Sequence, residues 1–459
     1  MLLKLAFAGV FAALLSSPAP VAEPPRFGPG SAGLGDFYFP NAGNGGYDVA
    51  HYSLHLRYEP STNELAGSAE LSATATQNLS QFDLDLRGFE ISKLSVDGLP
   101  ADFTRDGQEL VIVPRHRIRA GRTFRVEVEY AGQPEKLVNA DGSPSGWIPT
   151  DDGAFVASAP VGSPAWYPVN DNPQDKATFA ISVNVPAGLT AISNGVLVSR
   201  RAQHGRMTWS WRETVPMAPY LATATIGRFD LIESTLSDGT PNYIAVDPRF
   251  TDRSVLDRVE EIVEFMSSKF GPYPLDAVGV IVDSAPDVHY ALETQTKPLF
   301  SSMPSEVVLA HELAHQWFGD SVTPVRWKDV WLNEGFATFA QFLYGAQLGG
   351  PTLEQLFQQL MAVPAAFPSW AIPPGDPGSP AVLFDHFAVY LRGAATLEAL
   401  RERVGDDDFF SILRAWAREH RQGNATTEEF ISLAEHESGL DLGHFFEVWL
   451  FEPTKPSGW

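Results

Sequence analysis

Between Tyr47 and about Asp247 the chain alternates apolar and polar residues in short runs that are separated by Gly, Pro, Asn or Asp. The runs are YDVAHYSLHLRYE, ELAGSAELSATAT, ELVIVP, TFRVEVEY, ATFAISVNV, RMTWSWRE, YLATATIGRF and NYIAVD. Apolar residues at every second position predict strands with one buried face. The pattern therefore predicts a β-rich, sandwich-like region of packed sheets.

The periodicity changes after Asp247. DRSVLDRVEEIVEFMSSKFG carries apolar residues at three- and four-residue spacing, which predicts an amphipathic helix, and AVGVIV at 277–282 predicts a strand. We therefore expect a second domain to begin between residues 236 and 250. The predicted fold is α+β and multidomain, with a β-rich domain over 47–240 and an α/β domain over 241–459.

Further helical patterns fill the second region. WLNEGFATFAQFLYG predicts one helix, and FDHFAVYLRGAATLEALRERVG predicts the start of a long one. DDFFSILRAWAREH, TTEEFISLAEHES and LGHFFEVWLFEP predict three more. The proline-rich residues 364–380 cannot form a regular element, and we expect a loop that rims a cleft.

The first residues have another character. Residues 1–22 combine Lys4, a short apolar run and then small residues and prolines, which is typical of a secretory signal peptide. No later stretch reaches about 20 apolar residues, so no transmembrane segment is expected. We predict an exported protein, periplasmic or extracellular. Residues 23–46 are rich in Gly and Pro, and we expect them to form an extended lead-in that lies along the surface.

Composition narrows the function. The chain has 459 residues, 44% hydrophobic content and a formal net charge of −24. Nucleic acid is excluded as a partner, because phosphate binding needs a basic footprint that no segment provides. The absence of cysteine excludes disulfides, thiolate ligands and a cysteine nucleophile. The sequence does not indicate an oligomeric state.

The clearest chemical motif is HELAH at 311–315. On a helix His311 and His315 leave the same face one turn apart, so both can bind one ion, and Glu312 lies beside them. Hydrolytic zinc takes three N or O ligands and keeps one open position. Glu334 is the candidate third ligand, because 18 residues with turn signals separate it from His315. The alternative is a pair of core histidines.

HELAHQWFGD together with DVWLNEGFA resembles the zinc aminopeptidase family of aminopeptidase N and leukotriene hydrolase. The resemblance covers about residues 36–459. It implies one Zn2+ per chain bound by His311, His315 and Glu334, with Glu312 as general base, peptide substrates and a thermolysin-like second domain. Many members carry a further large helical domain, and a chain without it would have a more open cleft.

HYALETQTKPLF at 289–300 resembles the family's G-A-M-E-N strand, which binds substrate. Ala291 and Glu293 match the motif, whereas Tyr290, Leu292 and Thr294 replace its Gly, Met and Asn. An exposed strand can add backbone hydrogen bonds to a peptide, and a carboxylate can hold its ammonium group. The resemblance implies this role for Ala291 and Glu293. The alternative is an ordinary surface glutamate.

VYLRGA at 389–394 is similar to the family's Y-x-K/R-G-A helix. By that match Tyr390 stabilises the transition state, since a neutral phenol can donate one hydrogen bond to an oxyanion. Without the resemblance a core tyrosine would be the default. His386, one turn earlier, is expected to pack locally.

Ser158-Ala159-Pro160 aligns with a family substrate loop, but Ala159 stands where members place Glu or Gln. We expect a zinc metallo-aminopeptidase. The alternatives are a zinc hydrolase or oligopeptidase with a relaxed need for a free amino terminus, and a non-catalytic peptide-binding relative.

Overall fold

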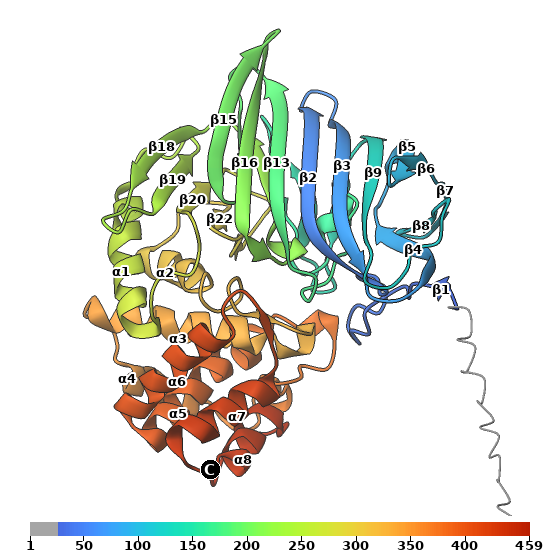
Figure 1. Ribbon diagram of the computed structural model, residues 1–459. Helices are drawn as coiled ribbons and strands as arrows, with labels where there is room; N and C mark the ends of the chain where they lie inside the picture. The colour runs from blue at the N-terminus through green and yellow to red at the C-terminus, as the bar shows by residue number, and fades with distance from the viewer. Residues whose placement is uncertain (1–25) are drawn as a thin grey trace, which may run out of the picture.

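The computed structural model describes residues 26–459, so the predicted signal peptide lies outside the described residues. Two regions follow one another along the chain (Figure 1). Strands dominate the first region, drawn in blue and green, and helices dominate the second, drawn in yellow to red. One continuous set of buried apolar residues runs through both regions. Among residues 26–459 no helix is long and apolar enough to cross a membrane.

An eight-stranded sheet forms the centre of the first region. Its strand order is β15-β16-β13-β2-β3-β9-β5-β6, and only the β13–β2 pair is parallel. Buried and partly exposed residues alternate along β13, as the period of two predicts. The strands are β2 (Tyr47–Glu59), β3 (Glu64–Ala75), β5 (Glu90–Val96), β6 (Leu99–Pro100), β9 (Thr123–Gly132), β13 (Ala177–Pro186), β15 (Val196–Gln203) and β16 (Arg206–Met217).

Two smaller sheets complete this region. The first has the order β1-β4-β8-β7, with β1 (Gly28–Pro29), β4 (Leu79–Asp85), β7 (Asp102–Asp106) and β8 (Glu109–Val113). The second has the order β10-β11-β12-β17-β14, with β10 (Lys136–Val138), β11 (Pro144–Pro149), β12 (Ala154–Ala157), β14 (Thr190–Ser193) and β17 (Ala224–Gly227). Short 3-10 turns lie at Ser163–Ala165 and Pro219–Leu221. The prediction of a strand over 220–229 was therefore too long, because Pro219 starts a turn and the paired strand β17 covers only Ala224–Gly227.

The second region opens with a mixed sheet of order β18-β19-β20-β22-β21. Its strands are β18 (Asp230–Thr235), β19 (Pro241–Val246), β20 (Val278–Val282), β21 (Ala291–Leu292) and β22 (Leu299–Phe300). The strand expected over 289–300 is wrong in extent, because a turn separates two short strands that pair with each other antiparallel. β21 lies at the edge of this sheet, and within residues 26–459 no strand pairs with its other side.

Helices build the rest. They are α1 (Val259–Phe270), α2 (Glu306–Ala314), α3 (Trp331–Gln347), α4 (Leu353–Met361), α5 (Arg392–Val404), α6 (Asp406–Glu419), α7 (Thr427–Ser438) and α8 (Gly443–Phe446). A two-stranded sheet pairs β23 (Thr323–Pro324) with β24 (Asn424–Ala425). The 3-10 turns are Ser254–Arg258, Trp327–Asp329, Pro368–Ala371 and Pro380–Val382, and the π-helical turns are His386–Leu391 and Glu447–Phe451.

Two of these elements differ from the predictions. The helix expected from Phe384 begins as the π-helical turn and becomes α-helical only at Arg392. α4 was not predicted; it begins with a capping box in which Thr352 and Gln355 bond to each other's backbone. The proline-rich segment contains the short 3-10 turn Pro368–Ala371 and ends at the turn Pro380–Val382, and each turn begins with a proline, whose missing N–H would have no partner at the first helical position.

The lead-in before β2 joins the two regions. The Asp36 carboxylate accepts a hydrogen bond from the Trp327 backbone N–H at 2.8 Å. The Tyr38 hydroxyl donates to Asp376 in the proline-rich segment and accepts from the Gly378 N–H at 2.6 Å. The start of the described chain is thereby tied to the helical region.

Candidate functional site

The site is built on α2. The Ser305 hydroxyl caps this helix by accepting from the Val308 N–H. His311 lies in the last turn and His315 at the carboxyl end, and both side chains are buried. The Nε2 atoms of the two histidines face each other at 3.1 Å. One turn of helix therefore brings two nitrogen ligands to one point, as the motif predicts.

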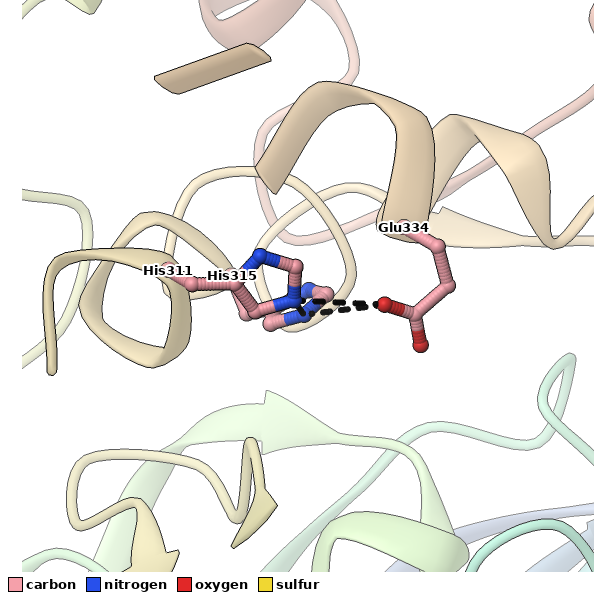
Figure 2. A group of neighbouring side chains, drawn as sticks. All are labelled: His311, His315 and Glu334. Carbon is pink, nitrogen blue, oxygen red and sulfur yellow. Dashed lines mark hydrogen bonds and ion pairs between the residues drawn. The ribbon is translucent and has the colours of Figure 1, made fainter. Parts of the chain in front are cut away.

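Glu334 comes from the first turn of α3, which packs on α2. Its Oε2 atom lies 3.4 Å from Nε2 of His311 and 3.4 Å from Nε2 of His315 (Figure 2). Figure 2 shows the carboxylate and the two imidazoles converging from the two helices. The sequence predicted this approach from the turn residues between the helices.

The three groups fit a zinc ion. Ligand atoms that lie 2.0 to 2.1 Å from a tetrahedral ion are about 3.3 to 3.4 Å from each other, and the three observed separations are 3.1, 3.4 and 3.4 Å. The Nδ1–H of His315 donates to the Phe318 carbonyl at 3.1 Å, which leaves the lone pair on Nε2. Buried electron-pair donors that meet in this way are stabilised by a cation between them, and a zinc ion there would replace the proton that the histidines otherwise share with Glu334.

Close helix packing brings a further residue to these ligands. A Cβ atom on Gly393 in α5 would lie 2.9 Å from the Cα of Gly335 in α3, so only glycine allows this approach. Gly335 follows Glu334, and Gly393 lies one turn beyond Tyr390. The Tyr390 ring stacks on the His311 ring with centroids 6.1 Å apart. Its π-helical turn is a feature common at functional sites.

Burial raises the pKa of Tyr390 well above 10, and the neighbouring Glu334 carboxylate raises it further. The phenol is therefore neutral over the physiological range and keeps its proton for a hydrogen bond. Such a group can stabilise a developing negative charge without a counter-ion.

Carboxylates surround the histidines. Burial raises the pKa of Glu312 to about 8 and that of Glu293 to about 7. For Glu334 burial acts in the same direction, but the charge of His315 and hydrogen bonds from both histidines lower its pKa to about 2. Burial would lower the pKa of His315, yet the carboxylates, Glu334 foremost, raise it to about 10. The electrostatic field of the site favours positive charge.

Glu293 completes the cluster from another direction. It follows β21 and is 6% exposed. Ligand atoms of Glu293, Glu312 and His315 all lie within 4.8 Å of one another. Ala291 lies on β21 and, together with Glu312, lines a cavity of about 600 Å³. The edge strand, the carboxylate and the metal ligands are thus neighbours, as the resemblance implies.

Two further residues from the sequence analysis, Ala159 and His386, have contacts of their own. The Ala159 carbonyl accepts from the Asn139 side chain at 3.3 Å in the β-rich region, and the described contacts do not join Ala159 to Glu293. His386 is exposed, and its ring stacks with that of Tyr390 at a centroid distance of 5.7 Å.

Sequence reasoning missed a half-buried lysine between the regions. Lys176 donates to the backbone carbonyls of Asp320 at 2.8 Å, Ser321 at 3.0 Å and Gly423 at 3.2 Å. Burial lowers the pKa of Lys176 to about 7. The lysine ties β13 to the loop that follows His315. Periodicity could not reveal it, because Lys176 lies in a loop-like stretch before a strand.

Gln316 and Thr296 were also missed. Gln316 directly follows the second histidine, and its Oε1 accepts from the Thr296 N–H at 2.7 Å. Both side chains are fully buried. The only signal in the sequence was position: Gln316 adjoins the metal motif, and Thr296 lies three residues after Glu293.

Two family descriptions match the chain. The peptidase family M1 domain matches residues 255–449, and the peptidase M1 N-terminal domain matches residues 49–221. The chain is 31% identical to aminopeptidase M1-A of Oryza sativa subsp. japonica over 67% of this chain and 37% of that protein. It is 27% identical to aminopeptidase N of Lactococcus lactis subsp. lactis over 63% of this chain and 38% of that protein. The chain thus spans less than half the length of these curated relatives.

Solved structures match over nearly their whole length. An M1 zinc metallopeptidase from Deinococcus radiodurans has a TM-score of 0.84 and 29% identity, and the match covers 93% of this chain and 98% of that one. A mutant M1 zinc metallopeptidase from the same organism, bound to a Tyr-Ser-Ala substrate, also has a TM-score of 0.84, with 28% identity over 93% of this chain and 99% of that one. The predicted fold class and zinc cofactor are confirmed by these matches. The chain belongs to peptidase family M1.

Proposed function

We propose that the protein is a zinc-dependent aminopeptidase that removes residues from the free amino terminus of peptides. The observation that carries this proposal is the position of Glu293, whose carboxylate lies within 4.8 Å of Glu312 and His315 without belonging to the metal ligands. A carboxylate at that distance can hold an ammonium group while the adjacent carbonyl lies at the metal. The proposed ligands are His311, His315 and Glu334.

Zinc bound at these ligands supplies a Lewis acid and lowers the pKa of water. Glu312 takes the proton from the attacking water and later gives it to the leaving amine, a role that suits a carboxyl whose pKa burial raises to about 8. Tyr390 donates its hydroxyl proton in a hydrogen bond to the carbonyl oxygen as that oxygen gains charge. Glu293 fixes the register of the substrate through its amino group.

The cavity beside β21 supports a peptide substrate. It is lined by Glu312, by Ala291 of β21 and by the residues just before Ala291, so it reaches from the proposed general base to the edge strand of the sheet. An extended peptide can pair with such an edge through backbone hydrogen bonds. The Deinococcus radiodurans complex with Tyr-Ser-Ala, a tripeptide, is in keeping with this substrate class.

A second candidate is an oligopeptidase with a relaxed need for a free amino terminus. Ala159 favours it, because a methyl group in the family's substrate loop accepts no hydrogen bond. In that case Glu293 alone would grip the amino group, and blocked peptides would also be cleaved.

The test compares L-leucyl-7-amido-4-methylcoumarin with its N-acetyl form and with an internally quenched peptide blocked at both ends. An aminopeptidase cleaves the first and neither of the others. Cleavage of the quenched blocked peptide supports the oligopeptidase. Zinc-loaded protein without activity on any of the three, tested with several side chains, would overturn both candidates.

We further propose that the protein is exported, on the basis of the signal-like residues 1–22. Fractionation of the source cells, with sequencing of the mature amino terminus, would test this.

A further inference from the structure

The corner formed by residues 294–297, directly after Glu293, has an unusual backbone. The Lys297 N–H donates to the Thr294 carbonyl at 3.0 Å, which closes a four-residue turn. Thr296 occupies the third position of this turn with φ of +69°. Glycine or asparagine normally fills such a position, and a β-branched residue there is strained. Something must hold Thr296 in this conformation.

Three contacts hold it. The Thr296 N–H donates to Oε1 of Gln316 at 2.7 Å, and its hydroxyl accepts from the Gly195 N–H at 2.8 Å. The buried Lys297 ammonium donates to the Gly195 carbonyl and lies 3.3 Å from the Thr296 hydroxyl. All four residues of the corner are fully buried. A glycine could adopt the same φ, but it would offer no hydroxyl to Gly195.

The preceding residue is held from the same side. The Asn194 side-chain amide donates to the Gln295 carbonyl at 2.8 Å and to the Leu221 carbonyl at 2.9 Å. The Asn194 side-chain oxygen accepts from the Thr223 N–H at 2.9 Å. The corner is therefore fixed by the β-rich region on one side and by the residue next to a metal ligand on the other.

Gln316 follows His315 directly in the chain. Two short links connect the metal ligand His315 to Glu293, which we call the amino-group grip because it is proposed to bind the substrate amino group. They are the peptide bond from His315 to Gln316, and the hydrogen bond from Gln316 to the corner that directly follows Glu293. Because the metal fixes the substrate carbonyl and Glu293 fixes the amino group, the spacing between them sets which bond is cleaved.

We infer that Thr296 and Gln316 are positioning residues that set the distance between the Glu293 carboxylate and the metal ligands, and so determine recognition of the substrate amino group. This inference rests on the proposed function. It assigns neither residue a contact with substrate. The strained φ of Thr296 is offset by the hydrogen bond that its hydroxyl accepts from the Gly195 N–H, which joins the corner to the β-rich region.

The test measures inhibition constants for two metal-binding probes, leucine hydroxamate and 4-methylpentanohydroxamate, which lacks only the amino group. Both bind metal through the same hydroxamate. The inhibition constant of the probe without the amino group, divided by that of leucine hydroxamate, therefore measures how much binding of the amino group by Glu293 contributes to affinity. The zinc-loaded variants are Thr296→Val, which keeps the shape and removes the acceptor, and its matched control Thr296→Ser, which keeps the acceptor. Gln316→Met removes the other contact and serves if Thr296→Val does not fold. Zinc content and thermal unfolding are measured alongside.

We expect Thr296→Val and Gln316→Met to reduce the ratio about tenfold, the scale of a weakened charged hydrogen bond, with one zinc per chain and unchanged affinity for the probe without the amino group. Thr296→Ser should keep the ratio of the wild type. Equal weakening of both probes, or an unchanged ratio, would overturn the inference. Glu293→Gln separates the two levels of the argument. If that variant keeps the ratio of the wild type, the proposed amino-group grip itself is wrong.

Discussion

The proposed metal ligands and Glu293, the proposed amino-group ligand, are neighbours, but different parts of the chain hold them. His311, His315 and Glu334 belong to two packed helices within residues 311–334, and helix periodicity sets their spacing. Glu293 follows a two-residue strand and depends on a strained corner that is fixed by Gly195 and Gln316. The metal site is thus a local construction, whereas the grip is assembled from segments about 100 residues apart in sequence.

This difference explains how substitutions should act. A change at the helices should affect the chemistry of every substrate, because all substrates need the metal and the base. A change at the corner should affect only substrates or probes with a free amino group. Variants can therefore be sorted by whether their effect depends on that group.

The largest effect is expected for Glu312→Gln. The amide keeps the size of the side chain but cannot accept the proton, so turnover should fall by about 10²-fold or more while zinc content stays at one per chain. Steady-state kinetics and metal analysis check this. Glu402→Gln on α5, an exposed position, is the matched control. Wild-type turnover in Glu312→Gln would remove the general base from the mechanism.

The same comparison shows what a sequence can reveal. The two helices of the site and the approach of Glu334 to the histidines were predicted, because local periodicity and turn residues dictate them. The strands of the β-rich region with a period of two were predicted for the same reason. The corner was wrongly expected to be strand, since the φ of Thr296 is imposed by Gln316 and Gly195, which lie far away in sequence. The contacts of Lys176 could not be predicted for the same reason, because its partners Asp320, Ser321 and Gly423 lie far away in sequence.

Tyr390→Phe should give the next largest effect. Loss of the phenol hydroxyl removes a donor needed as the carbonyl oxygen gains charge, so kcat should fall by about 10²-fold while KM changes little. Tyr344→Phe is the matched control, because that hydroxyl bonds Glu306 away from the metal ligands. A rise in KM with unchanged kcat would assign Tyr390 to substrate binding instead.

Ala159→Glu tests whether a second carboxylate can add to the recognition of the substrate amino group by Glu293. If the substrate loop reaches the amino terminus, a new carboxylate should raise the preference for a free peptide over its N-acetylated form by about tenfold or more. The measurement is kcat/KM for both peptides, with Ala159→Leu as a control that adds bulk without an acceptor. If the wild type already rejects the acetylated peptide and Ala159→Glu changes nothing, Glu293 alone suffices.

The smallest effect concerns buried carboxyls that have no metal nearby. Glu109 and Asp85 lie opposite each other on β8 and β4, and burial, followed by the Asp85 charge, raises the pKa of Glu109 to about 8. The folded state therefore keeps a proton that the unfolded chain releases above about pH 4.5. The stability that this difference contributes is fully present below about pH 4.5 and is lost as the pH rises from there through about 8.

Glu109→Gln, a neutral side chain of the same shape, should consequently gain stability relative to wild type as the pH rises from 5.5 to 8.5. Denaturant unfolding at both pH values checks this, with exposed Glu90→Gln on β5 as the control. A difference between variant and wild type that does not change with pH would show that Glu109 is ionised throughout.

The central claim is that one zinc ion, held by His311, His315 and Glu334, is required for peptide hydrolysis. The most direct measurement removes metal with a chelator and then titrates zinc into wild type and His315→Ala while following hydrolysis of L-leucyl-7-amido-4-methylcoumarin, with exposed His436→Ala as the control. We predict that activity in wild type and in His436→Ala rises linearly to a maximum at one zinc per chain, while His315→Ala stays inactive and binds zinc weakly. Full activity of the metal-free protein, or wild-type zinc binding by His315→Ala, would contradict the account.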